Sequence, residues 1–262
     1  MSPVSRYRVH KQFAATASVE VSERNGIRYL HLGSDTIQSA MRLTQPHDLA
    51  LSYTRCMMAF LLFVPPPARA VIIGLGGGSL AKFVYHRMPE TLITAVEINP
   101  GVVAAAREFF HLPDDPVRME VRIEDGVKYV GARSGSADLL LVDGYGTNEG
   151  APELATPGFY EDCAGALSDN GVLVANLFTR QKGLDAHLRL VKRVFGGRVL
   201  CLMDDRRGNL ITMAFMGKLG QPKWKSLQNR ATRLAEIYGL EFPLFVDSLK
   251  VMNSHHGRRL LI

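Results

Sequence analysis

The stretch AVIIGLGGGSL, residues 70–80, joins a short apolar run to a glycine-rich turn and then to a helix-like segment. Four glycines in such a strand-to-helix turn let the backbone pass close to a bound ligand and aim the N–H groups of the helix at it. The turn alone is a weak signal, because Ser79 stands where the G-x-G-x-x-G dinucleotide pattern has its last glycine, and glycine turns also form for steric reasons. The stretch predicts a ligand-binding α/β unit, which the flanking sequence has to support.

Apolar strands and helix-like segments alternate on the C-terminal side of this turn. The expected strands are LITAVEI, MEVRI, ADLLLVDG and residues 171–178, and the expected helices between and after them are PGVVAAAREFF, a short one after Asp125, 157–167 and 184–195. Such alternation is typical of a parallel sheet with crossover helices. The last two strands, 198–204 and 209–215, are separated by a turn short enough for a hairpin, so they are predicted to pair antiparallel.

The N-terminal side has a different organisation. Residues 18–32 alternate polar and apolar around Asn25-Gly26, a dipeptide that accepts the positive φ angles of a type I′ turn, which predicts a β-hairpin. Residues 49–64 look helical up to three prolines, and residues 223–240 form an amphipathic helix. We therefore expect a hairpin and helix region at 1–67, a catalytic α/β domain at 68–217, and a helix and tail packed on the core at 218–262.

Length and composition narrow the class of protein. The chain has 262 residues, of which 47% are hydrophobic and 21% charged, and its net charge of +6 is too small and too dispersed to predict a nucleic-acid partner. The most apolar run, residues 56–64, is too short for a bilayer that needs about 20 residues per helix, so no membrane partner is expected. Three distant cysteines, Cys56, Cys163 and Cys201, argue against a disulfide framework and for a cytoplasmic protein.

Motifs for several other chemistries are missing from the sequence. No G-x-S-x-G elbow, G-K-[S/T] phosphate loop or C-x-x-C pair occurs, so hydrolase, nucleotide triphosphatase and zinc functions have no support. The adjacent His255-His256 lack further ligands and are interpreted as a solvated tail, so no metal is expected.

Three acidic residues follow the ends of successive predicted strands. Glu97 closes the second strand, Asp125-Gly126 follows the third and Asp143-Gly144 follows the fourth. In an open α/β sheet these ends meet at one crevice, where a carboxylate can accept hydrogen bonds from ribose hydroxyls. Asp125 has the alternative of capping the next helix, and Asp143 that of anchoring its loop. Together with the glycine turn, the acids predict a nucleoside ligand.

Several of these runs, in this order, resemble the spermidine synthase-like branch of the class I S-adenosylmethionine (SAM)-dependent methyltransferase superfamily. The matching segments are DTIQSAM (35–41), IIGLGGGSL (72–80), VEINP (96–100), IEDG (123–126), LLLVDGYG (139–146), the pair Phe159-Tyr160, and GVLVANL (171–177). The resemblance implies an α/β, Rossmann-like, mainly parallel sheet with an antiparallel final strand and a small N-terminal β-hairpin region. It also implies a transferase that binds a SAM-type sulfonium nucleoside, and it makes a homodimer a further expectation.

The resemblance assigns roles to single residues. Glu97 would hold the ribose, Asp125 the adenine amino group, and Asp143 would face the reacting centre, where it is the best candidate for a catalytic base, with Tyr145 orienting the acceptor. The further expected cofactor-binding residues are Gln38, Tyr53, Arg55, Gly74, Gly76, Gly78 and Gly126.

The chain departs from the polyamine aminopropyltransferases of this branch at three acids. Gly77 stands where their glycine motif carries an acid, Gly146 stands where their D-x-x-D motif has its second acid, and their Y-H-E segment becomes Tyr53-Thr54-Arg55. If Arg55 faces the cofactor, it repels an aminopropyl ammonium and attracts the carboxylate that intact SAM has and decarboxylated SAM lacks. The alternative is that Arg55 points to solvent or pairs with Asp48 or Glu149.

These departures place SAM-dependent methyl transfer to a small-molecule or protein acceptor first among the candidate functions. One alternative is polyamine aminopropyl transfer from decarboxylated SAM, with another residue in place of the missing acids. The other is a non-catalytic nucleoside-binding scaffold. The sequence does not identify the acceptor, because a resemblance in fold does not choose among acceptors.

Overall fold

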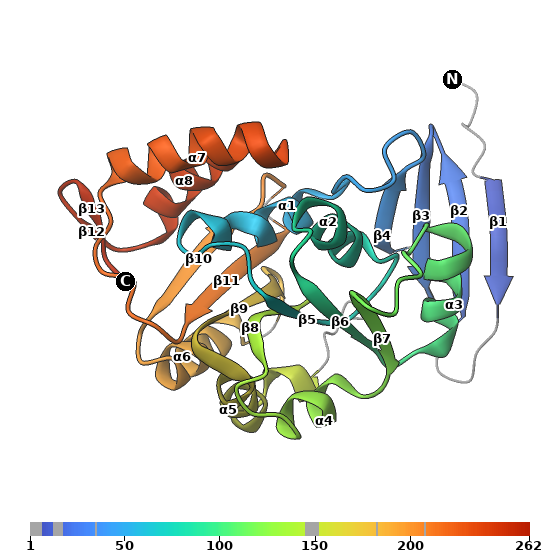
Figure 1. Ribbon diagram of the computed structural model, residues 1–262, viewed down its shortest axis with the longest axis horizontal. Helices are drawn as coiled ribbons and strands as arrows, with labels where there is room; N and C mark the ends of the chain where they lie inside the picture. The colour runs from blue at the N-terminus through green and yellow to red at the C-terminus, as the bar shows by residue number, and fades with distance from the viewer. Residues whose placement is uncertain (1–6, 13–17, 35, 145–151, 182, 207) are drawn as a thin grey trace.

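The computed structural model of the chain describes residues 7–12, 18–34, 36–144, 152–181, 183–206 and 208–262. Its centre is a seven-stranded sheet in the order β10-β11-β9-β8-β5-β6-β7 (Figure 1). The strands are β5 (Arg69–Ile73), β6 (Leu92–Glu97), β7 (Met119–Ile123), β8 (Ala137–Val142), β9 (Leu167–Phe178), β10 (Val199–Met203) and β11 (Asn209–Phe215). β11 is antiparallel to both neighbours, and the other adjacent pairs are parallel. The predicted fold class is confirmed.

Helices cover both faces of this sheet (Figure 1). One face packs against α4 (Gly126–Gly131), α5 (Pro157–Ala166) and α6 (Leu184–Val194). The other packs against α1 (Ser52–Met57), the 3-10 helix η1 (Met58–Leu62), α2 (Ser79–Arg87), α7 (Trp224–Tyr238) and α8 (Phe242–Met252). Because both faces are buried, β5 and β8 are continuous apolar runs rather than alternating ones.

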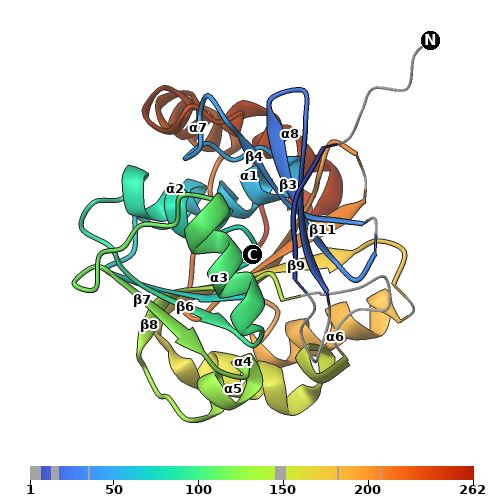
Figure 2. The same ribbon diagram turned by 90° about the vertical axis from the view of Figure 1, so that its right-hand side faces the viewer.

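A second, four-stranded antiparallel sheet stands beside the first, with α3 (Pro100–Phe109) between the two (Figure 2). Its strands are β1 (Tyr7–Gln12), β2 (Val19–Arg24), β3 (Ile27–Leu32) and β4 (Ile37–Arg42). Val103 and Ala106 of α3 join the core of the large sheet, whereas its Val102 and Ala105 join Val19 and other residues of the small one. α3 therefore fixes the small sheet against the large one.

The predicted hairpin is confirmed, and the small sheet extends beyond it. Asn25 and Gly26 have φ angles of 52° and 72°, as a type I′ turn requires, between β2 and β3. The polar stretch that follows the hairpin forms β4, a strand that was not predicted. β4 brings the matching segment DTIQSAM alongside the glycine turn, where the Ser39 and Ser79 hydroxyls lie 3.2 Å apart.

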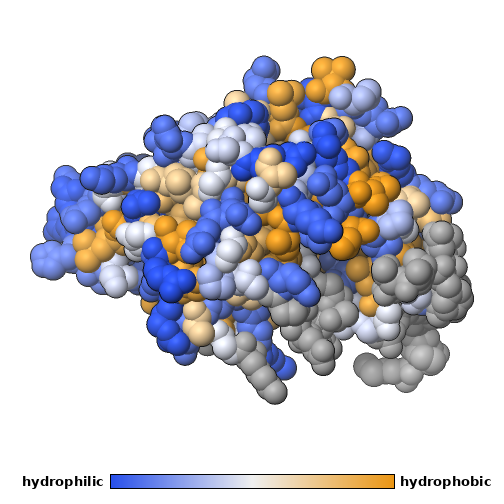
Figure 3. All heavy atoms as spheres, turned by 90° about the horizontal axis from the view of Figure 1, so that it is seen from below, coloured by the Kyte–Doolittle hydropathy of each residue, from blue (hydrophilic) through white to orange (hydrophobic). Residues whose placement is uncertain are grey.

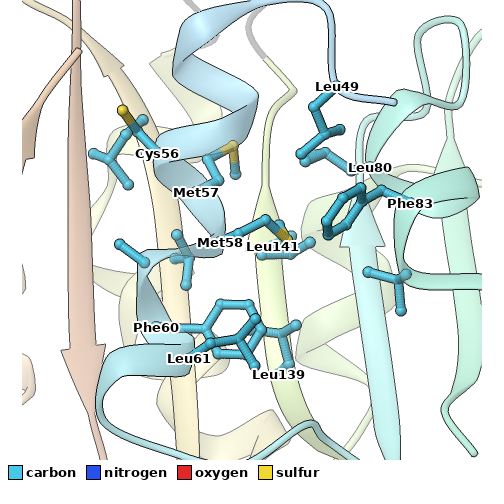
Figure 4. Packing of buried hydrophobic residues seen from close by; sticks show 14 of the residues in the cluster. Leu49, Cys56, Met57, Met58, Phe60, Leu61, Leu80, Phe83, Leu139 and Leu141 are labelled. Atoms are coloured by element: carbon cyan, nitrogen blue, oxygen red, sulfur yellow. The ribbon is translucent and has the colours of Figure 1, made fainter. Parts of the chain in front are cut away.

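The predicted helix at 49–64 is two shorter elements, α1 and η1. All five residues of η1 are buried, so this apolar run has no exposed face. It forms a short 3-10 helix in the core on the sheet face that α1, α2, α7 and α8 cover. Figure 4 shows Phe60 and Leu61 of η1 close to Leu139 of β8 in this core. α7 confirms the predicted C-terminal helix, but α8, which follows it after Gly239, was not predicted.

The remaining elements are short. A 3-10 helix, η2 (Pro152–Ala155), precedes α5, and β12 (His255–His256) pairs with β13 (Arg259–Leu260) near the C-terminus. Both histidines are exposed, as expected for a solvated tail. Hydrophilic and hydrophobic side chains are interspersed on the face drawn in Figure 3. Among the residues that the structure describes, no helix has the length and apolar character needed to cross a membrane.

Candidate active site

A pocket of about 520 Å³ opens at the carboxyl ends of the parallel strands. β5 lies between β6 and β8. From β5 the chain first adds β6 and β7 on one side and then continues with β8 on the other side, so the strand order reverses at β5. Ligands of open α/β sheets bind in the crevice at such a switch point. Residues from the glycine turn, from the ends of β6 and β8, and from β4, α1, α4 and η2 line the pocket, including Gln38, Tyr53, Gly74, Gly76, Glu97, Asp125, Gly126, Asp143 and Glu153.

The glycine turn brings the end of β5 against the end of β8. Gly74 has a φ angle of 89°, and a Cβ atom there would lie 2.5 Å from the carbonyl oxygen of Asp143. Only glycine permits this approach. Gly76 also lines the pocket, but Gly78 does not, and a Cβ at Gly78 would lie 2.7 Å from Cδ1 of Leu112. The contact of Gly78 with a cofactor therefore stays a prediction; in the structure this glycine allows the turn to pack on Leu112.

Glu97 is held in place by the backbone around it. One carboxylate oxygen accepts a hydrogen bond from the N–H of Leu75 in the glycine turn and the other accepts from the N–H of Asn99, both at 3.0 Å. Burial raises the pKa of Glu97, and the backbone donors of Asn99 and Leu75 oppose this rise. The N–H groups of Gly76 and Ile98 act on the same carboxylate, which also lines the pocket.

Asp125 combines the two roles that the sequence left open for it. Its Oδ1 accepts a hydrogen bond of 2.8 Å from the N–H of Val127 and so caps α4. The residue also lines the pocket together with Gly126. The cap uses only Oδ1, so Oδ2 of Asp125 takes no part in capping α4.

Asp143 is a half-buried acid of the site. Its Oδ1 accepts from Nδ2 of Asn176 at 2.8 Å, and its Oδ2 accepts from the hydroxyl of Tyr53 at 3.1 Å. Burial raises the pKa of Asp143 to about 6, although these two hydrogen bonds act to lower it. Burial and the nearby Asp143 also raise the pKa of Tyr53 well above its usual value, so the phenol stays protonated and donates. Asp143 therefore changes its charge close to neutral pH.

Arg55 is turned away from the pocket, so the prediction that it contacts the cofactor is wrong. Its Nε donates to Oε1 of Glu241 at 2.6 Å, and its guanidinium also donates to the carbonyl oxygens of Leu49 and Ala50. It lines a separate cavity of about 380 Å³. Of the two partners proposed for Arg55, Asp48 pairs with Arg87 instead, and Glu149 lies outside the described residues. Tyr145 also lies outside them.

The described lining of the pocket carries negative charge and no positive charge. Glu97, Asp125, Asp143 and Glu153 line it, whereas no lysine, arginine or histidine does so among the residues that the structure describes. The sequence analysis missed Glu153 and Asn176. Nothing distinguished Glu153 within its polar stretch, but Asn176 is an isolated polar residue in an apolar strand, a pattern that indicates a buried hydrogen bond.

Comparisons with known proteins agree with this architecture. Residues 50–194 match the spermine/spermidine synthase domain. The polyamine aminopropyltransferase of Chromobacterium violaceum is 43% identical, and the match covers 98% of each chain. A crystal structure of a probable spermidine synthase from Corynebacterium glutamicum superposes with a TM-score of 0.73 over 98% of each chain, at 19% identity, and supports the fold.

A methyltransferase matches over a shorter part of the chain. The human eEF1A lysine and N-terminal methyltransferase is 31% identical over 51% of this chain and 21% of its own length. The aminopropyltransferase match, by contrast, includes the N-terminal sheet and the C-terminal helices. The chain belongs to the spermine/spermidine synthase family, a family of transferases.

Proposed function

We propose that the protein transfers an aminopropyl group from decarboxylated SAM to a short aliphatic diamine. The observation that carries this proposal is the charge of the pocket, which has four carboxylates and no basic side chain among its described lining residues. Decarboxylated SAM carries a sulfonium and an ammonium, and the acceptor arrives as a cation, so all three charges gain from this lining. Intact SAM would place a carboxylate among like charges without a cationic partner.

The residues around the glycine turn fit the nucleoside part of this donor. Glu97 and Asp125 lie at neighbouring strand ends, and both line the pocket. We assign Glu97 to the ribose hydroxyls and Asp125 to the adenine amino group. Gly74, Gly76 and Gly126 line the pocket with backbone atoms, and a Cβ atom at Gly74 or Gly126 would collide with Asp143 or Ile73.

Asp143 supplies the base that the acceptor needs. Only an unprotonated amine can attack, whereas an alkyl ammonium has a pKa near 10 and arrives protonated. With a pKa of about 6, Asp143 is ionised at neutral pH and can take this proton. Tyr53 donates to the same carboxylate and fixes its orientation.

The bound donor would supply a carbon activated by the sulfonium. The acceptor nitrogen forms a bond to that carbon, the carbon–sulfur bond breaks with its electron pair going to sulfur, and neutral methylthioadenosine leaves. Because the acceptor has already given one proton to Asp143, the product leaves as a secondary ammonium, and Asp143 returns its proton to water. The protein contributes alignment, exclusion of water and this proton acceptor.

At two positions, Gly77 and Gly146, the related motifs carry an acid and this chain does not. A Cβ atom at Gly77 would lie 2.8 Å from Cδ1 of Phe110 and 2.9 Å from Oγ of Ser39, so packing already fills the place of an acidic side chain. Glu153, exposed at the mouth of the pocket, is our candidate for the charge that Gly146 lacks. It would hold the distal ammonium of the acceptor.

The comparisons favour aminopropyl transfer over methyl transfer, which the sequence analysis placed first. The similarity to a polyamine aminopropyltransferase covers 98% of the chain. Arg55 pairs with Glu241 and does not line the pocket, so the main argument for intact SAM is removed. The homodimer, the cytoplasmic location and the division into three regions stay predictions.

The test is a comparison of donors with purified protein. We expect decarboxylated SAM and 1,4-diaminobutane to give methylthioadenosine and an aminopropylated diamine, as detected by mass spectrometry. Decarboxylated SAM and methylthioadenosine should raise the melting temperature more than SAM does, because a ligand that binds only the folded state stabilises it. Formation of S-adenosylhomocysteine from SAM, without turnover of the decarboxylated donor, would reject the proposal in favour of methyl transfer. No shift with any of these nucleosides would favour the scaffold.

A further inference from the structure

A closed ring of hydrogen bonds connects Asp143 to the helix that carries Tyr53. From Asp143 it runs to Nδ2 of Asn176, and Oδ1 of Asn176 accepts from Nδ2 of Asn209, both at 2.8 Å. The N–H of Asn209 donates to Oδ1 of Asp204 at 2.9 Å, and Oδ2 of Asp204 accepts from the hydroxyl of Ser52 at 3.1 Å. Ser52 precedes Tyr53 on α1, and Tyr53 donates back to Asp143.

The antiparallel strand β11 makes this ring geometrically feasible. Ile211 of β11 pairs with Asn176 of β9, so Asn209, two residues away, projects from the same face of the sheet as a diagonal neighbour of Asn176. This face packs against α1. Asp204 ends β10 at the same edge, where its backbone N–H donates to the carbonyl oxygen of Asn209. Asn176 and Asp204 are 3% and 4% exposed, so water does not compete freely for these contacts.

We propose that Asn209 and Asp204 are positioning residues that, through Asn176 and Ser52, orient the Asp143 carboxylate and hold the Tyr53 helix against it. Neither residue lines the pocket, so any effect on the reaction passes through their neighbours. This inference concerns the same site as the proposed function, and its kinetic part rests on that function.

The direction of each hydrogen bond carries the inference. A side-chain amide can present either its N–H or its oxygen, and only the N–H stabilises the anionic form of Asp143. Because Nδ2 of Asn209 donates to Oδ1 of Asn176, the amide of Asn176 is fixed with its N–H groups toward Asp143. Asp204 in turn anchors the backbone of Asn209 and the start of α1.

Other charged groups around Asp143 are constant in this comparison. Tyr53 of α1 is the titratable group in hydrogen-bond contact with it, and Glu97, Asp125 and Glu153 line the same pocket from β6, the start of α4 and η2. Asn209→Ala leaves all four unchanged, whereas Asn209→Asp also adds a carboxylate.

The test measures the pKa of Asp143 directly by NMR titration of protein with carbon-13-labelled aspartate carboxyl groups, with Asp143→Asn used to assign the signal. In Asn209→Ala the amide of Asn176 loses its partner and can rotate, so we expect the pKa of Asp143 to rise by about one pH unit, equivalent to about 1.4 kcal/mol. In Asn209→Asp, which matches the size of the original side chain but cannot donate to Asn176, we expect a larger rise.

The matched control is Ser168→Ala. Ser168 also lies on β9 and also donates to a carboxylate, Oδ1 of Asp138 at 2.8 Å, but it lies at the opposite end of the strand. It should leave the pKa of Asp143 unchanged.

Kinetics provide the second readout. The acid limb of the kcat/KM–pH profile for decarboxylated SAM should move upward with the NMR value, and the rate should recover at higher pH. An Asp143 pKa in Asn209→Ala equal to that of the wild type overturns the proposal, and so does a rate loss equal at every pH. If Asn209→Ala does not fold, an unchanged value in Asn209→Asp has the same effect. A wild-type protein without aminopropyl transfer would reject the proposed function but leave the NMR test intact.

Discussion

Replacing Asp143 with asparagine should stabilise the fold while it slows the reaction. Burial raises the pKa of Asp143 from 3.8 to about 6, so the folded protein disfavours the charged form. The stability cost is absent well below pH 4, where the carboxyl is protonated in both states, grows between pH 4 and pH 6, and is fully present above about pH 7. At 1.36 kcal/mol for each pH unit, the charge costs up to about 3 kcal/mol at pH 8. Asn is the neutral isostere, so Asp143→Asn should recover up to this amount.

Urea unfolding at pH 4 and pH 8 measures this effect. The free energy of unfolding of Asp143→Asn should exceed that of the wild type at pH 8, and at pH 4 this excess should fall to about 0.5 kcal/mol. Asp138→Asn is the control of opposite sign, because hydrogen bonds from Ser168 and Arg69 outweigh burial and lower the pKa of Asp138. It should lose stability at pH 8. An Asp143→Asn protein without a pH-dependent gain would refute the reasoning that burial penalises this charge.

The same substitution separates stability from catalysis. Loss of a general base costs about 10²-fold or more in rate, so kcat should fall by at least that factor while affinity for methylthioadenosine stays unchanged. In the wild type, a base with a pKa of about 6 is about 90% ionised at pH 7 and about 10% at pH 5. kcat/KM should therefore fall about tenfold between these pH values. A rate that is unchanged in Asp143→Asn would remove the residue from the reaction.

Three further substitutions test the other parts of the site. Arg55→Glu should destabilise the protein, because it places a second acid beside Glu241, with which Arg55 now pairs. It should leave the preference for decarboxylated SAM over SAM unchanged, and a switch in this preference, measured by calorimetry, would show that Arg55 acts on the bound donor. Gly77→Asp should lower the free energy of unfolding by about 1–3 kcal/mol in thermal or urea unfolding, because its Cβ would overlap Phe110; an unchanged stability would mean that an acid fits there. Glu153→Gln should raise the KM for 1,4-diaminobutane about two- to fivefold with little change in kcat, and a KM equal to that of the wild type would exclude it as the acceptor anchor.

The part of the site that the sequence predicted follows from topology. Glu97, Asp125 and Asp143 end or follow parallel strands, and the alternation of strands and helices was sufficient to place those ends along one edge of a sheet. The glycine turn added the position of the pocket on that edge. No pairing register was needed, because parallel strands joined by right-handed crossovers point their carboxyl ends the same way.

The part that the sequence did not predict depends on long-range pairing. Arg55 and Glu241 are separated by 186 residues, and Glu241 stands at the start of α8, a helix that the hydrophobic pattern did not reveal. The contact between Asn176 and Asn209 requires β11 to lie between β9 and β10, whereas the sequence predicted only that β10 and β11 form a hairpin. Side-chain direction at such positions is set by tertiary packing, which periodicity does not report.

Arg55 also shows why a substitution at a matched motif position does not by itself predict specificity. The electrostatic effect of an arginine depends on where its guanidinium lies, and here Glu241 and two backbone carbonyl groups hold it in a second cavity. By fixing Arg55 there, α8 keeps positive charge out of the pocket that Asp143 and Tyr53 line. Under the proposed function, donor selection therefore depends on the packing of α8 as well as on the motif.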